Sequence, residues 1–106
     1  MKLIQIKETE SKFGSFGNQG QSDFYNILDG EYAGEVEYSP KQNEVLSIYI
    51  GKAFRGKGIG RKVINQLFDL YDTNEIFALS AKSSLPFWKK VSTKKLKNNY
   101  FIVEKN

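Results

Sequence analysis

The spacing of the apolar residues changes in the middle of this 106-residue chain, and that change limits the folds open to it. Across residues 45–50 apolar residues alternate with others, which predicts a strand with Leu46, Ile48 and Ile50 on one face. Beyond Gly58 the apolar residues recur at intervals of three and four, which predicts an amphipathic helix. A strand joined to a helix by a short loop favours an α+β or mixed α/β fold.

Further strands are predicted on both sides of this unit. An Asp-Gly pair separates two alternating runs and predicts a tight hairpin turn, so the first half of the chain reads as an antiparallel meander. The predicted elements are strands at residues 3–6, 24–28, 32–38, 45–50, 76–81 and 99–104, a loop at 14–22, a helix from 59 to 71, and a short helix that ends near 91. The chain is long enough for one core, so we expect a single domain over residues 1–106 with a central β-loop-α-β unit.

The composition excludes several kinds of site. The chain contains no Cys and no His, which rules out disulfides, Cys or His metal ligands, a thiol nucleophile and an imidazole base. No metal is therefore expected. No apolar run approaches the roughly 20 residues that cross a bilayer, and the N-terminal MKLIQIKETE is charged too early for a signal peptide. These features predict a cytoplasmic protein that does not associate with membranes.

Charge is distributed unevenly along the chain, although the formal net charge is +4. Residues 8–44 contain eight acidic and two basic residues, whereas residues 52–62 contain five basic residues and no acidic one. A second basic segment, residues 82–97, contains six lysines and again no acid. This pattern indicates two partners of opposite charge, or alternatively the solvated faces of a lysine-rich protein.

The basic, glycine-rich loop that precedes the helix predicts an anion site. The first N–H groups of a helix have no intrahelical partner, and the peptide dipoles place partial positive charge there. A nucleotide P-loop is excluded because no Gly-Lys-Ser or Gly-Lys-Thr stands at the required spacing. A dinucleotide fold is disfavoured because residues 51–57 intervene between the strand and the helix, and the next strand ends in Ser80-Ala81 instead of an acid.

The segment RGKGIG, residues 55–60, has the form [RQ]-x-x-G-x-[GA] and follows an L-x-I-x-I strand by four residues. It resembles the pyrophosphate loop of the GNAT superfamily of acyl-CoA-dependent N-acyltransferases. ILDGEYAGEVEY before it resembles the second and third strands of that family, and FALSAKSSLPFWKKV after it resembles the later strand and short helix. The resemblance covers about residues 24–91 and implies a splayed mixed sheet.

Three departures from the family pattern are visible. The family usually has two helices between its first and second strands, where this chain offers only residues 10–23, so a shortened N-terminal helical region is expected. Trp88 stands where a tyrosine often acts as general acid. Ala81 stands where an asparagine often contacts the cofactor. The resemblance therefore implies a miniature member of the family whose catalytic residues depart from the common set.

The resemblance implies acetyl-CoA as the acyl donor. Its diphosphate would accept hydrogen bonds from the loop backbone, while Arg55, Lys57, Arg61 and Lys62 would supply positive charge. The backbone of the strand at 45–50 would hold the pantetheine arm and the thioester where the sheet splays. The implied cofactor-binding residues are Ile48, Ile50, Arg55, Gly56, Lys57, Gly58, Ile59, Gly60 and Arg61.

Acetylation of an amine requires a base, because the amine must lose a proton. Glu44 is the first candidate, since it stands eleven residues before Arg55, where a histone-acetyltransferase-like branch of the family places its glutamate; the alternative is a solvated turn residue. Glu35 and Glu37 are further candidates that could also attract a cationic acceptor. Tyr49, together with Tyr38, is a candidate proton donor to the leaving thiolate.

The preferred function is an N-acetyltransferase that transfers acetyl from acetyl-CoA to a primary amine by direct attack in a ternary complex. The acceptor would be a protein lysine, an N-terminus or a small polyamine-like molecule. The first alternative is an inactive or weakly active acyl-CoA-binding protein that regulates a partner. The second is nucleic-acid association through the basic tail, with Trp88, Tyr100 and Phe101 as stacking groups. Either a monomer or a homodimer is compatible with this reading.

Overall fold

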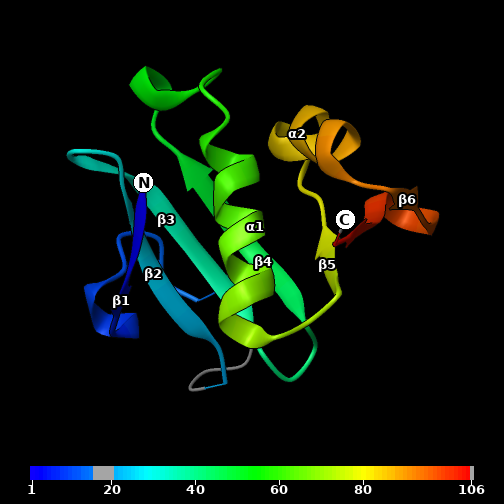
Figure 1. Cartoon of the computed structure of the whole chain (residues 1–106), viewed down its shortest axis with the longest axis horizontal. Coiled ribbons are helices and arrows are strands. Elements are labelled where there is room, and N and C mark those ends of the chain that lie inside the picture. The colour runs from blue at the N-terminus through cyan, green and yellow to red at the C-terminus, as the bar shows by residue number, and fades with distance from the viewer. Residues whose placement is uncertain (16–20, 106) are drawn as a thin grey trace.

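The computed structural model describes residues 1–15 and 21–105 and contains a seven-stranded sheet with the strand order β1-β2-β3-β4-β5-β7-β6 (Figure 1). The strands are β1 (Lys2–Ile6), β2 (Asp23–Leu28), β3 (Tyr32–Ser39), β4 (Glu44–Ile50), β5 (Glu75–Leu79), β6 (Lys94–Lys95) and β7 (Tyr100–Glu104). The α-helices are α1 (Ile59–Tyr71) and α2 (Leu85–Val91), and the 3-10 turns are η1 (Glu8–Glu10), η2 (Lys52–Phe54), η3 (Lys82–Ser84) and η4 (Lys97–Asn99). The predicted α+β class is confirmed. Of the predicted loop at 14–22, residues 16–20 lie outside the described residues.

Strands β2 to β4 form the predicted antiparallel meander, and β1 pairs antiparallel with β2 beside it. Its tight turn between β2 and β3 uses Gly30 at a φ of 80°, a conformation that glycine adopts without steric cost. The pairing of β3 with β4 shifts by one residue, since Tyr38 pairs with Val45 while Glu37 pairs with Ser47. A β-bulge therefore leaves Leu46 without a partner and reverses the alternation of β4.

The bulge corrects one prediction about β4. Val45 belongs to the core, and Ile48 and Ile50 pack against it, whereas Leu46 is not among the core contacts. A strict two-residue period had placed Leu46 on the same face as Ile48 and Ile50. A bulge inserts one residue and changes the face that follows, and the sequence carries no signal for it.

The sheet splays between β4 and β5. These strands are parallel and pair only through Glu44 with Phe77 and Val45 with Ala78, after which they diverge (Figure 1). By contrast, β5 pairs with β7 along its whole length. The second half of β4 therefore has a strand neighbour on the β3 side and none on the β5 side among the described residues.

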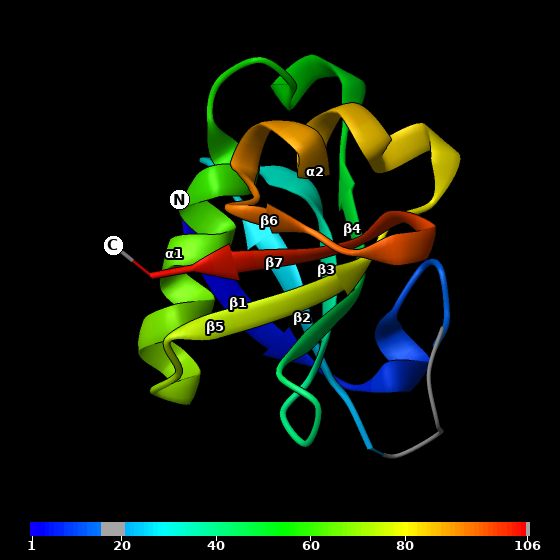
Figure 2. The ribbon, with the colours of Figure 1, turned by 90° about the vertical axis from the view of Figure 1, so that its right-hand side faces the viewer.

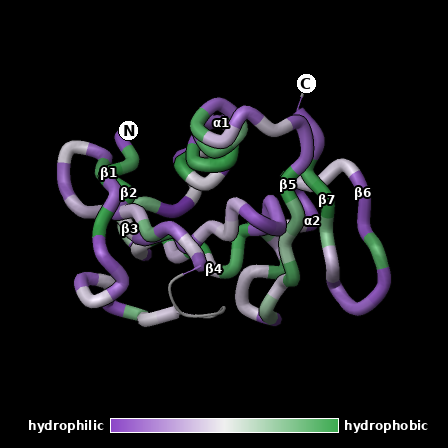
Figure 3. The backbone as a smooth tube through the Cα atoms, turned by 90° about the horizontal axis from the view of Figure 1, so that it is seen from below, coloured by the Kyte–Doolittle hydropathy of each residue, from purple (hydrophilic) through white to green (hydrophobic). Residues whose placement is uncertain are grey.

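Helix α1 lies against one face of the sheet, as Figures 2 and 3 show from two directions. Its buried residues are Ile59, Gly60, Val63, Ile64, Leu67 and Phe68, the stripe that the helical spacing predicted. The end of α1 is tied to β2, because the Tyr71 hydroxyl donates to Asp23 at 2.6 Å and lies 2.6 Å from the Tyr25 hydroxyl. The core is continued by Trp88 and Val91 of α2.

The opposite face of the sheet has no α-helix over it in the part of the chain that the structure describes. The segment from η1 to Ser15 runs there instead, on the side of the strands away from α1 (Figure 3). This arrangement confirms that the N-terminal helical region is shortened. The polar groups that hold the segment in place belong to the candidate site and are described below.

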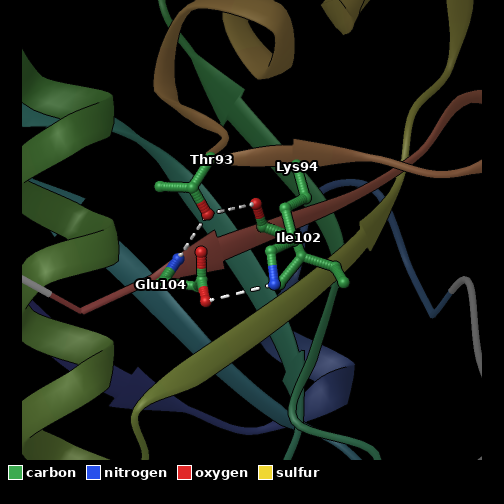
Figure 4. Close-up of polar contacts among 4 residues, drawn as sticks. All are labelled: Thr93, Lys94, Ile102 and Glu104. Carbon is green, nitrogen blue, oxygen red and sulfur yellow. Dashed lines mark hydrogen bonds and ion pairs between the residues drawn. The ribbon is translucent and has the colours of Figure 1, made fainter.

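The C-terminal hairpin of β6 and β7 was only half predicted, because a two-residue strand of lysines has no apolar alternation. Thr93 fixes its open end, since its Oγ1 donates to the Ile102 carbonyl and accepts from the Glu104 N–H, both at 3.2 Å (Figure 4). Lys94 adds an exposed ion pair to Glu104 at 3.6 Å. The hairpin thereby places β6 at the edge of the sheet.

Candidate active site

The loop between β4 and α1 is shaped by two glycines in the left-handed region. Gly56 has a φ of 78° and Gly58 a φ of 75°, and a side chain built at either position would meet nothing within 4 Å. Both positions therefore favour glycine because of the backbone conformation, and both leave open space on the outside of the loop. Gly58 is also the N-cap of α1.

The start of α1 has unsatisfied donors. Gly58 contributes no side-chain cap, and the first intrahelical bond runs from the Lys62 N–H to the Gly58 carbonyl at 3.2 Å. The N–H groups of Ile59, Gly60 and Arg61 therefore precede the hydrogen-bonded ladder. No acidic residue stands in the first turn to neutralise the helix dipole. The site is suited to an anion.

The basic side chains around this loop carry no acidic partner in the described ranges, where the ion pairs involve only the N-terminus, Lys94 and Lys105. The Arg55 side chain is positioned by the end of β4, since its Nε donates to the Ile50 carbonyl at 2.8 Å. Lys57, Arg61 and Lys62 are exposed. The loop therefore combines unpaired positive charge with free backbone donors.

Gly60 is required for the packing of the two α-helices. It is buried, and a Cβ at this position would collide with the ring of Phe87 on α2. Its small size is thus required for the close approach of α1 and α2. Phe87 in turn packs edge-on against Trp88 at 4.9 Å between ring centroids. Trp88 is buried in the core.

The second half of β4 presents free backbone groups to the splay. The Gly51 N–H donates to the Ala33 carbonyl on the β3 side at 2.7 Å, so by alternation the backbone of Tyr49 also faces β3. The backbone groups of Ile48 and Ile50 consequently face the side from which β5 has departed. Of these groups, the Ile50 carbonyl already accepts from Arg55.

Strands β3 and β4 approach closely at Gly34. A Cβ on Gly34 would collide with the carbonyl oxygen of Tyr49, so no larger residue fits without movement of the backbone. This contact fixes the position of the second half of β4 from the β3 side. The Gly that follows the hairpin turn is thus needed for strand spacing.

Glu44 lies at the N-terminal end of β4, where β4 still pairs with β5. Its carboxylate accepts a long hydrogen bond from the Tyr100 hydroxyl at 3.5 Å. Burial raises the pKa of Glu44, and the hydrogen bond from Tyr100 opposes that rise. The pKa of Tyr100 is also raised, first by burial and then by the charge of Glu44. A half-buried carboxylate with a raised pKa is suited to accept a proton.

Tyr49 does not share this end of the strand. Glu44 and Tyr49 are five residues apart on β4, which at roughly 3.3 Å per residue separates them by about 15 Å. Tyr49 is 38% exposed, and its ring packs at a tilt against Phe13, with 4.8 Å between the centroids, and lies beneath Arg55. The structure therefore does not bring the two predicted catalytic residues together.

The other candidates for proton transfer have structural partners. Tyr38 is in the core, its hydroxyl donates to Asn43 at 3.2 Å, and burial raises its pKa to about 12. Glu35 is buried and accepts from the Ser11 hydroxyl at 2.6 Å and the Lys12 N–H at 2.8 Å.

Glu37 is likewise buried beneath the N-terminal segment. Its carboxylate accepts from the hydroxyls of Ser15 and Ser22 at 2.8 and 2.5 Å. Glu35 and Glu37 thus fasten the segment that covers this face of β3. The expectation that these two carboxylates attract a cationic acceptor is not supported by their surroundings.

Tyr100 is the residue of this site that the sequence did not assign to it. The sequence offered Tyr100 only as a stacking group for nucleic acid, because its place beside Glu44 depends on β7 pairing with β5. The register sets Leu79 opposite Tyr100 and Phe77 opposite Ile102, which brings the Phe77 and Tyr100 rings to 6.0 Å. An antiparallel strand at residues 99–104 was the only available signal.

Two further hollows have no residue of β4 in their lining. One, of about 280 Å³, runs between α1 and the end of β7 and includes Arg61, Asn65 and Glu104 in its lining. The other, of about 550 Å³, is a shallow depression beside Tyr100. The candidate site is defined instead by the backbone geometry of β4 and the loop, because an open groove in a splayed sheet encloses little volume.

Comparison with solved structures finds two spermidine N-acetyltransferases with the same fold. One is a mutant of SpeG from Vibrio cholerae, with a TM-score of 0.52 and 14% sequence identity over 82% of this chain and 68% of that chain. The other is a chimera of the Vibrio cholerae enzyme with hSSAT, with a TM-score of 0.53 and 14% identity over 81% and 68% of the two chains. A search of curated proteins gave no significant match.

No helix among the described residues is long and apolar enough to cross a membrane. Within the same ranges, no group of three acidic side chains is placed to hold a metal ion. The model of the acetyltransferase (GNAT) family matches residues 5–91, which include the meander, the basic loop, α1 and α2. The chain therefore belongs to the GNAT acetyltransferase family.

Proposed function

We propose that this protein is an N-acetyltransferase that binds acetyl-CoA along β4 and transfers its acetyl group to a primary amine. The observation that carries the proposal is the arrangement of β4, whose open edge leads from the free helix N-terminus at Gly58 to the carboxylate of Glu44. One strand thus connects a phosphate site with a base.

The residues present fit acetyl-CoA. The diphosphate would lie against the backbone N–H groups from Gly56 to Arg61, where the loop has no side chain in the way and no neutralising acid. Lys57 and Lys62 supply positive charge to the phosphates. The pantetheine arm would pair with the backbone of Ile48 and the N–H of Ile50, which have no strand neighbour among the described residues.

The proposed proton transfer takes place at the N-terminal end of β4. A primary amine with a pKa near 10.4 is protonated at neutral pH, so it must lose a proton before its nitrogen can attack the thioester carbon. Glu44 accepts that proton, the C–N bond forms, and the C–S bond breaks to release CoA thiolate, which takes a proton from solvent. Tyr100 is a positioning residue that orients the Glu44 carboxylate.

The proposal assigns a base, Glu44, but no residue as the proton donor to the leaving thiolate. Tyr49 lies about 15 Å from Glu44 along the strand. We therefore propose that Tyr49 supports Arg55 and Phe13 at the cofactor end, and that the leaving thiolate needs no dedicated acid. A thiol has a pKa near 8.5, so the thiolate is a good leaving group. Solvent can therefore supply its proton.

The experiment that tests the proposal is calorimetric titration with acetyl-CoA, followed by thiol-release assays with several amines. We expect binding that weakens as salt rises from 50 to 500 mM, because unpaired cations near phosphates are screened. Affinity that does not respond to salt would contradict the phosphate site. Absence of acetyl-CoA binding would overturn the proposal as a whole.

One observation favours the alternative of an acyl-CoA-binding regulator. Trp88 is buried in the core and, by the resemblance, stands where a tyrosine often serves this family as acid. Tight acetyl-CoA binding with no thiol release from lysine peptides, spermidine or a free N-terminus would favour that alternative. Thiol release above the hydrolytic background would exclude it. A cytoplasmic location is likewise proposed here and follows from the sequence features alone.

A further inference from the structure

The shallow hollow beside Tyr100 has an apolar wall. Leu79 at the end of β5 is 58% exposed and Leu96 at the end of β6 is 45% exposed, and both line this hollow of about 550 Å³. Lys97, Asn98 and Tyr100 complete its lining. Two large exposed side chains that face one depression mark a surface for contact with another molecule.

The hollow is preformed by the turn between β6 and β7. Asn98 and Asn99 are consecutive non-glycine residues in the left-handed region, with φ values of 61° and 59°. The turn is held by the Leu96 N–H to the Tyr100 carbonyl at 2.6 Å and by the Ser80 N–H to the Asn99 carbonyl at 2.9 Å. Asn adopts this region more readily than other non-glycine residues, and the two hydrogen bonds define the course of the turn.

The hollow adjoins the proposed reaction centre. Tyr100 lines it and donates to the Glu44 carboxylate, and Leu79 pairs with Tyr100 across β5 and β7. An acceptor that places its amine at Glu44 therefore has neighbouring atoms within reach of Leu79 and Leu96. A small diamine has no apolar side chain to fill such a surface.

Charge at this site also opposes a polyamine. Lys97 lines the hollow, Lys95 precedes it in the edge strand, and no acid belongs to the lining. Glu35 and Glu37, which could have attracted a polycation, are buried under the N-terminal segment. A polycationic acceptor would meet one carboxylate, Glu44, and a lysine rim.

From these contacts we infer that the acceptor amine belongs to a protein or peptide segment that inserts an apolar side chain between Leu79 and Leu96 and directs an acidic residue to Lys97. The inference rests on the proposed N-acetyltransferase function and names its acceptor class. It also sets this chain apart from its structural neighbours, whose names specify spermidine.

The test uses capped nine-residue peptides with one free lysine, tested by thiol release against spermidine. One set carries leucine at successive positions near the lysine and glutamate at the ends; matched sets replace leucine with serine, or glutamate with arginine. We expect the best leucine–glutamate peptide to exceed both its serine match and spermidine in kcat/KM by about tenfold or more, the order expected for burial of one leucine.

Protein variants test the same surface from the other side. Leu79→Ser and Leu96→Ser should each raise KM for the best peptide about five- to tenfold without changing acetyl-CoA affinity. Leu70→Ser is the matched control, because Leu70 is 54% exposed on α1 and does not line the hollow. Lys97→Glu should reverse the preference between glutamate and arginine flanks.

The outcomes separate this inference from the proposed function. Turnover that is fastest with spermidine, or that is unaffected by Leu79→Ser and Leu96→Ser, would overturn the peptide acceptor while the enzyme stands. Absence of acetyl-CoA binding would remove the proposed function, and this inference with it. Equal effects of the Leu70 control and the two hollow variants would also contradict the docking surface.

Discussion

The two ends of β4 differ in what they are made of. At the C-terminal end, the proposed cofactor site consists of backbone groups: the glycine loop, the first N–H groups of α1 and the open edge at Ile48. At the N-terminal end, the proposed reaction site consists of side chains, Glu44 and Tyr100, from strands 56 residues apart in sequence. Binding and chemistry are therefore separable, and each end can be altered while the other is kept.

The largest effect is expected from Glu44→Gln, which removes the proposed base and keeps its size. We expect kcat to fall at least about 10²-fold, since loss of a general base typically costs 10² to 10⁴. The affinity for acetyl-CoA should change less than twofold, because the phosphate loop lies at the other end of the strand. Steady-state thiol release and calorimetry measure the two quantities.

A matched control for this variant is Glu104→Gln, a carboxylate of β7 that is paired only with Lys94 at the surface and should leave kcat unchanged. Equal kcat values for Glu44→Gln and the unaltered protein, with the same pH profile, would remove Glu44 from the mechanism. A loss of acetyl-CoA affinity in the same variant would show that the two ends are not separable.

The second effect concerns the cofactor end. Gly58→Glu places a negative side chain where the phosphates are proposed to bind, and we expect the dissociation constant for acetyl-CoA to rise about 100-fold. This corresponds to roughly 3 kcal/mol, the contribution of one or two charge-assisted hydrogen bonds. Calorimetry provides the measurement.

Gly30→Glu is the matched control for backbone strain. Gly30 has a φ of 80° and, like Gly58, open space around the position of a Cβ, but it lies in the β2–β3 turn. Both variants should lose a similar amount of stability, of the order of 1–2 kcal/mol in thermal unfolding. If Gly30→Glu weakens acetyl-CoA binding as much as Gly58→Glu does, the loss would come from strain and not from the anion site.

The smallest effect is expected at Tyr100. Its hydrogen bond lowers the pKa of Glu44 against the effect of burial, so Tyr100→Phe should raise that pKa. A base must be deprotonated to act, so the acid limb of the kcat profile should move to higher pH, and kcat near neutral pH should fall less than about tenfold. Rates from pH 5 to 9 measure the shift.

Tyr49→Phe makes the same chemical change at the cofactor end and serves as the control. It keeps the ring that packs against Phe13 and should leave the pH profile unchanged. A lower kcat in Tyr49→Phe with an unchanged Tyr100→Phe would restore Tyr49 as the proton donor and contradict the assignment made here.

The cofactor end could be predicted from sequence because its parts are contiguous. Strand, loop and helix follow one another within about 27 residues, and local spacing determines each of them. Gly58 illustrates this, since its position at the start of the helix can be predicted from the local spacing alone. Gly60 illustrates the limit, because its contact with Phe87 depends on how α2 packs.

The reaction end could be predicted only in part. Glu44 was proposed as a base from its spacing to Arg55, but its hydrogen-bond partner Tyr100 required the β5–β7 register, which no local pattern specifies. The bulge at Leu46 and the burial of Glu35 under Ser11 and Lys12 have the same origin. In each case a contact between distant segments decided the environment of a residue whose type was known.

The splay has a consequence for the folding of the molecule. Strands β1–β4 and β5–β7 share only two ladder pairs, Glu44 with Phe77 and Val45 with Ala78, so the sheet is held across this line mainly by the core beneath α1. In the proposed complex the pantetheine arm pairs with the open edge of β4 and fills the gap beside β5, so it takes the place of a missing strand. Acetyl-CoA should then raise the unfolding temperature by mass action, and slow amide exchange most in β4 and β5. Acetyl-CoA would thus stabilise the junction between the two halves of the sheet.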